Sequence, residues 1–179
     1  MRAAVLVGGL VFLAAPLLAQ QDSTKTDSAK ADSVKAESVA TVPAPPTPAQ
    51  ERYLEGLSTA GRGIAQIKSG IARVANAVNS DTARLRSAGR ILAGYCATGH
   101  GYMSRGRATM DAKAYEDSTR QKARALMVQI DSLLRAAPEC EQNAAQNPAP
   151  AAAVLLQRIR AYEAALRDFR TAIGLPNRQ

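Results

Sequence analysis

The sequence has few of the side chains from which catalytic and metal sites are built. It contains no tryptophan, two phenylalanines, two cysteines and a single histidine, His100. A structural zinc ion needs four ligands, usually cysteines and histidines, and the chain offers three such side chains. The motifs GxSxG, GxxxxGK and HExxH do not occur either. We therefore expect a protein that is not an enzyme and that holds no metal ion and no cofactor.

Long apolar runs are also missing, except within the first nineteen residues, MRAAVLVGGLVFLAAPLLA. There a positive charge at Arg2 precedes an uncharged apolar stretch, and the small Ala19 precedes a polar sequence. This order predicts a secretory signal peptide over residues 1–19. An uncleaved membrane anchor is the alternative, because residues 3–19 reach the lower limit of what spans a bilayer. We expect cleavage near Ala19, which makes the mature protein periplasmic or extracellular.

Apolar periodicity is absent from residues 20–49. The pentapeptides QDSTK, TDSAK, ADSVK and AESVA follow one another, and VPAPPTP closes the segment with four prolines. A five-residue period advances by about 140° per repeat around a helix, so that it forms no continuous apolar stripe. The segment therefore predicts a disordered, low-complexity linker of mixed charge.

Cys96 and Cys140 are the only two cysteines. Because an even number of cysteines in an exported protein usually pairs, we predict an intramolecular disulfide rather than two free thiols or a disulfide-linked dimer. If the two cysteines lie level with each other in an antiparallel hairpin, the turn falls near residue 118, whereas a turn at residue 111 would leave them about 21 Å apart along the helices. We therefore expect a turn between residues 111 and 118, or an early end to the third helix. The sequence offers a helix start at each of these positions, Asp111 and Ser118.

What the sequence does contain is helical periodicity. From residue 51 to residue 79 the apolar residues are spaced alternately by four and by three positions, which keeps a narrow apolar seam facing a partner helix. Gly56, Gly63 and Gly70 recur every seven residues beside this seam and predict the close approach of another helix backbone. The seam residues are Tyr53, Leu57, Ala60, Ile64, Ile67, Ile71, Val74 and Val78.

The second segment, residues 81–110, carries a similar but weaker seam. This seam includes Leu92, Tyr95 and Tyr102, but the segment also holds five glycines, each of which disfavours a helix interior by about 1 kcal/mol relative to alanine. Two explanations fit this composition. Either the backbones of the first two helices approach each other closely, or residues 97–107 are partly unwound.

Two further segments complete the domain of residues 50–179. The third has its apolar positions in its second half and ends at Pro138, and the fourth runs from about Ala149 to Ile173 and stops at Gly174. No strand-like alternation of useful length occurs. The sequence predicts an all-α fold, an antiparallel bundle of three to four helices.

Residues 94–107, GYCATGHGYMSRGR, place His100 four residues after Cys96, so that the two share a face on a continuous helix. A cysteine nucleophile needs a histidine, and that histidine needs a third group to orient it. No acid or amide neighbours His100 in the sequence, and Cys96 has a disulfide partner. We interpret the segment as scaffold and assign no catalytic residue.

Negative charge is scarce in the C-terminal domain. Residues 50–179 contain 19 arginines and lysines against 11 aspartates and glutamates, and this excess equals the net charge of +8 of the whole chain. Arginine forms bidentate contacts with phosphate and carboxylate groups, although a solvated arginine-rich surface is the alternative. Residues 80–110 alone hold five arginines against Asp81. The candidate contacts for an anionic partner are Arg86, Arg90, Arg105 and Arg107.

Nucleic acid is not an expected partner, because the other aromatic residues occupy seam positions and Tyr115 alone is left to stack on bases. We expect an exported, non-enzymatic helical-bundle protein with a structural or protein-interaction role in the cell envelope. Its partner would be another protein, or a second copy if the seams of the first and fourth helices are not filled internally. The alternative is a cationic, amphipathic helical protein that binds an anionic membrane or a polyanion surface.

Overall fold

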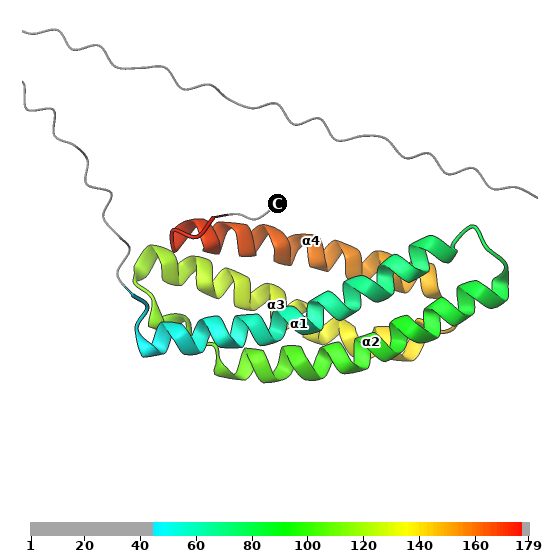
Figure 1. Cartoon of the computed structure of the whole chain (residues 1–179), viewed down its shortest axis with the longest axis horizontal. Coiled ribbons are helices and arrows are strands. Elements are labelled where there is room, and N and C mark those ends of the chain that lie inside the picture. Colours follow the sequence, from blue (N-terminus) through cyan, green and yellow to red (C-terminus); the bar gives the residue numbers. More distant parts are fainter. Residues whose placement is uncertain (1–44, 177–179) are drawn as a thin grey trace, which may run out of the picture. The chain divides into compact units, whose positions relative to one another are not determined.

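A computed structural model describes residues 45–176, so the predicted signal peptide and nearly all of the predicted linker lie outside the described residues. The described part is all-α, as predicted, and forms an up-and-down antiparallel bundle of four helices (Figure 1). The elements, in chain order, are α1 (Pro48–Ala77), α2 (Thr82–Thr109), the 3-10 turn η1 (Ala112–Ala114), α3 (Asp117–Asn143) and α4 (Pro148–Ala172).

Helix α1 begins where the chain supplies a cap. The Thr47 hydroxyl accepts a hydrogen bond from the Gln50 amide, and the Gln50 side chain accepts one from the Thr47 amide at 2.9 Å. With Pro48 at its first position, the helix starts two residues before the predicted domain boundary. The predicted seam is buried along most of its length, but Val78 is 48% exposed because the helix ends at Ala77.

Helices α1 and α2 approach each other so closely that the contact requires glycine. A Cβ atom on Gly63 would lie 2.5 Å from the carbonyl oxygen of Gly99, and one on Gly56 would lie 2.6 Å from the carbonyl oxygen of Gly106. The glycines that weaken α2 as an isolated helix therefore allow backbone-to-backbone packing. The close approach is confirmed, and the alternative of unwinding at residues 97–107 is wrong, because α2 is continuous through them.

The connection between α2 and α3 lies within the predicted interval. η1 follows α2, and α3 begins at Asp117, between the two predicted starts at Asp111 and Ser118. The Cα atoms of Cys96 and Cys140 are 6.0 Å apart and their sulfur atoms are bonded. The disulfide is therefore intramolecular, as predicted, and it joins α2 to α3.

Helix α3 continues past Pro138, where the sequence predicts its end. Proline has no amide hydrogen, so the helical hydrogen bond to the carbonyl of Leu134 is lost, at a cost of about 3 kcal/mol in a helix interior. The following turn offsets this loss, since Cys140 forms the disulfide and Ala144 is fully buried. The prediction was wrong because tertiary packing outweighs the local preference of proline.

An aromatic cluster closes the end of the bundle at which α1 begins. The rings of Tyr53, Tyr115 and Phe169 have centroids 5.2 to 5.3 Å apart. The Tyr53 hydroxyl also donates a hydrogen bond to the carbonyl of Ala123 at 3.0 Å. Tyr115 is 6% exposed, so the expectation that it is free to stack on a ligand is wrong. The cluster fastens the α2–α3 connection against α1 and α4.

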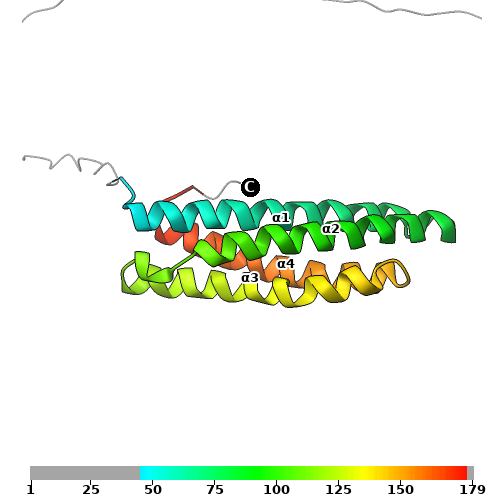
Figure 2. The ribbon, with the colours of Figure 1, turned by 90° about the horizontal axis from the view of Figure 1, so that it is seen from below.

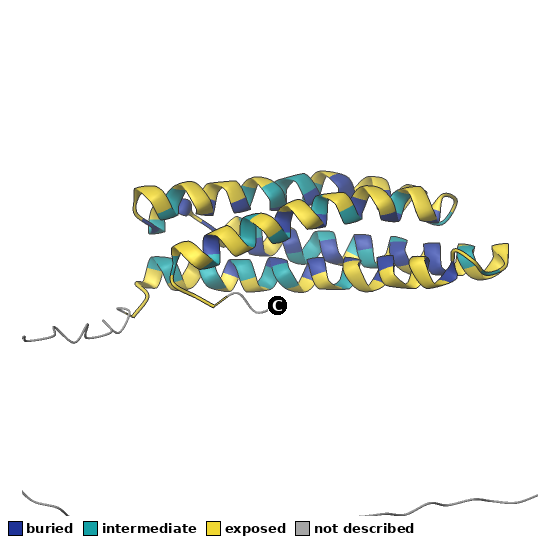
Figure 3. Ribbon diagram, turned by 90° about the horizontal axis from the view of Figure 1, so that it is seen from above, coloured by how far each residue is buried: buried dark blue, intermediate teal, exposed yellow. Residues whose placement is uncertain are grey.

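The helices form two hairpins, α1–α2 and α3–α4, which pack on each other mainly through α2 and α3 (Figure 2). Buried residues line the inward faces of all four helices (Figure 3). Gly89 of α2 lies against the α3–α4 turn, close to Ala144 and Pro148. The α1–α2 hairpin therefore extends beyond this turn, and its tip, where the chain passes from Ala77 at the end of α1 to Thr82 at the start of α2, stands out from the bundle (Figures 1 and 2).

Candidate functional site: the arginines of the α1–α2 hairpin

The positive charge of the described residues is concentrated on one hairpin. The α1–α2 hairpin carries nine arginines and lysines and three acidic residues, two of which, Glu51 and Glu55, lie with Arg52 at the start of α1. The remainder, residues 56–110, carries eight arginines and lysines and one acidic residue, Asp81. Residues 111–176, which include the α3–α4 hairpin, carry nine basic and eight acidic residues. Like charges on neighbouring helices repel each other, so the fold does not require this concentration. It marks the α1–α2 hairpin as the candidate functional surface.

Two of the eight cations are used inside the bundle. Lys68 of α1 pairs with Glu163 of α4 at 2.5 Å. In α2, Nε of Arg107 lies 2.8 Å from Oδ1 of Asp131, and its Nη2 donates to Oδ2 of Asp131 at 3.1 Å. Both pairs join one hairpin to the other. The expectation that Arg107 is available to an anionic partner is therefore corrected, because its guanidinium already holds a carboxylate.

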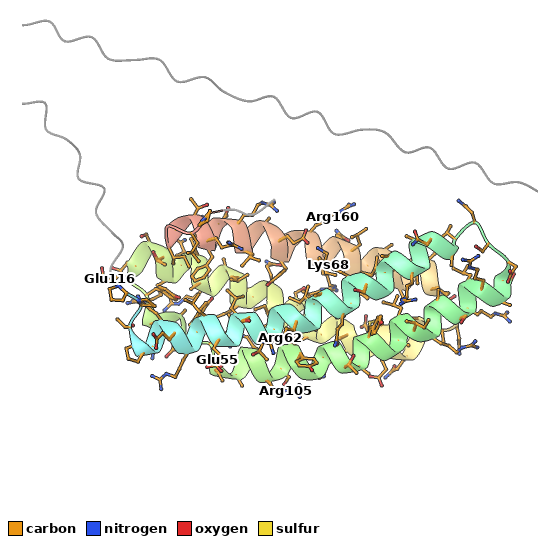
Figure 4. The ribbon with its side chains drawn as sticks, in the orientation of Figure 1. Glu55, Arg62, Lys68, Arg105, Glu116 and Arg160 are labelled. Atoms are coloured by element: carbon orange, nitrogen blue, oxygen red, sulfur yellow. A yellow bond between two sulfur atoms is a disulfide. The ribbon has the colours of Figure 1, made fainter. Side chains whose placement is uncertain are left out.

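The other six cations are exposed and form no ion pair within residues 45–176. Arg105 lies over the ring of Tyr102, with its Cζ atom 4.8 Å from the ring centroid, in a cation–π contact. Figure 4 shows Arg62 and Arg105 on the α1–α2 hairpin and Arg160 on α4, at the opposite edge of the bundle. We call the six the hairpin arginines: Arg62, Arg73, Arg84, Arg86, Arg90 and Arg105.

Part of the hairpin surface consists of small and polar residues, which lie beside the ring of Tyr102 and the exposed Ile91. The Thr98 hydroxyl donates to Oε1 of Gln66 at 3.0 Å, which links α2 to α1 on the outer side of the hairpin. A Cβ atom on Gly94 would meet no other group within 4 Å, so this glycine lies on the open surface rather than at the helix contact.

Sequence analysis located part of this cluster. Arg86, Arg90 and Arg105, three of the predicted contacts for an anionic partner, are exposed. Three hairpin arginines were not among the predicted contacts: Arg62 and Arg73, because α1 was interpreted from its apolar seam alone, and Arg84, although it lies in the basic segment of residues 80–110. A signal was available, since residues 56–80 contain no acidic residue at all.

The segment that combines Cys96 with His100 is part of the α2 scaffold. Cys96 is fully buried and disulfide-bonded, so it offers no thiolate to a neighbouring histidine. His100 is half-buried on the same helix. Within residues 45–176, no cluster of three or more histidine, cysteine, aspartate or glutamate side chains is arranged to hold a metal ion.

The titratable groups with shifted pKa values are core tyrosines. Burial raises the pKa of Tyr162 to about 12, and the charge of Glu163 adds to the rise. Burial also raises the pKa of Tyr53 and that of Tyr115. These hydroxyls stay neutral near neutral pH and serve the packing of the core.

Among the helices of residues 45–176, none has both the length and the apolar composition that crossing a bilayer demands. The chain matches no protein-family model, no curated protein and no solved structure.

Proposed function

We propose that the protein is an exported, non-enzymatic binding module of the cell envelope, and that its α1–α2 hairpin holds an anionic partner. The observation that carries this proposal is the set of six hairpin arginines, which are exposed and have no acidic partner within residues 45–176. The guanidinium group presents a planar fork of donors that fits phosphate and carboxylate groups. An anionic partner would supply the countercharge that the hairpin lacks.

The location rests on two observations. The disulfide between Cys96 and Cys140 supports export, because such bonds persist in oxidising compartments and are rare in the cytosol. The sequence of residues 1–19, which lie outside the described residues, adds the pattern of a secretory signal peptide. Outside the cytosol, envelope surfaces and their polymers offer dense anionic groups.

Association through the helix seams has less support, because the bundle uses these seams internally. Ile64 and Ile67 of α1 and Ile159 of α4 are each at most 2% exposed. Leu57 of α1 and Leu166 of α4 are the partial exceptions, and both pack against the core from half-buried positions. The charged surface of the α1–α2 hairpin is therefore the better supported route to a partner.

The proposal is tested with two anionic probes, phosphatidylglycerol vesicles and polyglutamate, at low and at high salt. We expect binding at low salt that weakens as salt screens the charges. The fourfold variant R73Q/R84Q/R86Q/R90Q should weaken it further. Because a cation near an anionic surface contributes about 1 kcal/mol, four lost cations correspond to a loss of roughly 10- to 1000-fold in affinity.

A matched control separates the hairpin from net charge. The variant R124Q/R135Q/R160Q/R167Q removes the same number of exposed, unpaired arginines from α3 and α4. It should bind within about threefold of the wild type, a difference of less than 1 kcal/mol. Equal losses in the two fourfold variants would show that net charge alone drives binding, and the proposal would then be wrong.

A further inference from the structure

A cleft of about 260 Å³ lies between α1 and α2 near the protruding tip of the hairpin. Its lining includes Ala77 and Ala88, which are 3% and 7% exposed and form a buried floor. Because these floor side chains are small, they leave a space for a ligand, and larger side chains would fill that space. The cleft is therefore a hollow bounded by longer side chains of the two helices.

Cations line this cleft from both helices. Arg73 comes from α1 and Arg84 from α2, and neither forms an ion pair within residues 45–176. Asp81 is the acidic residue nearest to them in sequence. Its carboxylate caps α2 by accepting a hydrogen bond from the Arg84 amide at 2.8 Å, and it is not part of the cleft lining. Two arginines, one from each helix, therefore line one hollow that has no carboxylate among its lining residues.

Neutral donors complete the lining. Asn76 of α1 and Ser87 of α2 both line the cleft, and neither side chain forms a hydrogen bond within the described residues. Ile91, which is 38% exposed, adds an apolar patch beside them. A phosphate group has several strong acceptor oxygens and favours such a set of charged and neutral donors, while the apolar patch suits the organic part of an ester.

We infer that this cleft binds the phosphate group of a phosphate ester, with Arg73 and Arg84 as the charged contacts and Asn76 and Ser87 as the neutral donors. The inference rests on the proposed function and narrows it, from any anion to phosphate and from the whole hairpin to one cleft. A phospholipid headgroup and a soluble phosphate ester share this chemistry, and the experiment distinguishes them.

The experiment uses the mature chain and three probes: glycerol phosphate, phosphatidylglycerol vesicles and polyglutamate. Glycerol phosphate is titrated by NMR, which follows the side-chain signals of the arginines and of Asn76, and vesicle binding is measured by sedimentation. R73Q/R84Q should weaken the binding of a phosphate probe by at least about tenfold. N76A and S87A keep the net charge and should each weaken it by roughly threefold. Because all four side chains are exposed, we expect thermal unfolding close to that of the wild type.

The matched control lies on the same hairpin. R86Q/R90Q removes two exposed arginines that do not line the cleft, so it should weaken glycerol phosphate binding by less than about threefold. If R86Q/R90Q and R73Q/R84Q lose the same affinity for glycerol phosphate, the assignment of the phosphate site to the cleft is wrong. The hairpin would then be a general anion-binding surface. The assignment is also wrong if the protein binds polyglutamate but binds neither glycerol phosphate nor the vesicles.

The remaining outcomes distinguish the proposed function, anion binding by the hairpin, from the narrower inference of a phosphate site in the cleft. If none of the three anions binds, the proposed function fails together with the inference. If vesicles bind, glycerol phosphate does not, and R73Q/R84Q abolishes the vesicle binding, the ligand is a lipid headgroup. If glycerol phosphate binds with the expected variant effects and vesicles do not, the ligand is a soluble ester.

Discussion

Replacing Gly63 by alanine tests whether the packing of α1 on α2 depends on glycine. The new methyl group would lie 2.5 Å from the carbonyl oxygen of Gly99 and 2.9 Å from Cβ of Tyr102, whereas ordinary contacts begin at 3.4 Å. The helices would have to separate by about 0.9 Å at this point, the difference between the two contact distances. Overpacking costs about 1 to 3 kcal/mol, and a backbone carbonyl cannot rotate away, so we take the upper value. Because alanine favours the helix by about 1 kcal/mol relative to glycine, the free energy of unfolding should fall by about 2 kcal/mol in total.

Urea unfolding followed by circular dichroism measures this loss, and Gly94 provides the control. A Cβ atom on Gly94 would meet nothing within 4 Å, so Gly94→Ala should stabilise the fold by roughly 0.5 to 1 kcal/mol. The change in the free energy of unfolding for Gly70→Ala should lie between those of the other two variants. The atom nearest to a Cβ on Gly70 is Cδ1 of Leu92 at 2.8 Å, the end of a side chain that can shift. If Gly63→Ala proves as stable as Gly94→Ala, the glycine contact does not hold the hairpin together and our reasoning fails.

Three further changes test other parts of the fold. Replacing Cys96 and Cys140 together by alanine should lower the free energy of unfolding by about 4 kcal/mol for a loop of 44 residues, and an unchanged thermal midpoint would contradict the stabilising role of the bridge. A chain that begins at residue 45 should unfold at the same temperature as the mature protein. One that begins at residue 50 loses the Thr47 cap and should be about 1 kcal/mol less stable, unless the cap contributes nothing. Burial raises the pKa of Tyr162 from 10.0 to about 12, so between these pH values the folded state keeps the phenol proton while the unfolded state loses it. The contribution of Tyr162 to stability should be constant below pH 10 and should fall by roughly 2 to 3 kcal/mol between pH 10 and 12. In Tyr162→Phe the fall in stability between pH 10 and 12 should be smaller. If the fall is unchanged, other titrating groups cause it.

The fold could be predicted because its strongest signal is local. A seam with alternating spacings of four and three determines which face of a helix is buried, whatever the partner is. Tyr53, Ile64, Ile67 and Val74 are accordingly all at most 2% exposed. The seam failed only at Val78, because helix ends depend on the turn that follows, and that turn carries no apolar signal.

The face that α2 buries was harder to predict, because this helix has two packed neighbours. The expected seam contains Tyr95 and Tyr102, which are half-buried, whereas Cys96 and Met103 are fully buried. Helix α2 contacts α1 on one side and α3 on the other, so its buried face is wider than a single seam. A pattern derived from one partner helix therefore finds only one edge of that face.

The candidate site depends on the same pairing of helices and for that reason was only partly visible in the sequence. Charge counts predict that residues 80–110 are basic, but they do not show that Arg73 and Arg84, on different helices, line one cleft. That arrangement follows from the α1–α2 register, in which Gly63 lies opposite Gly99. The glycines that bring the backbones together also bring their cations together, which raises the repulsion within the hairpin. The ion pairs of Lys68 and Arg107 with the other hairpin relieve two of the eight charges. The six that remain are the part of the charge pattern that packing does not account for, and the proposed anionic partner would give it a physical reason.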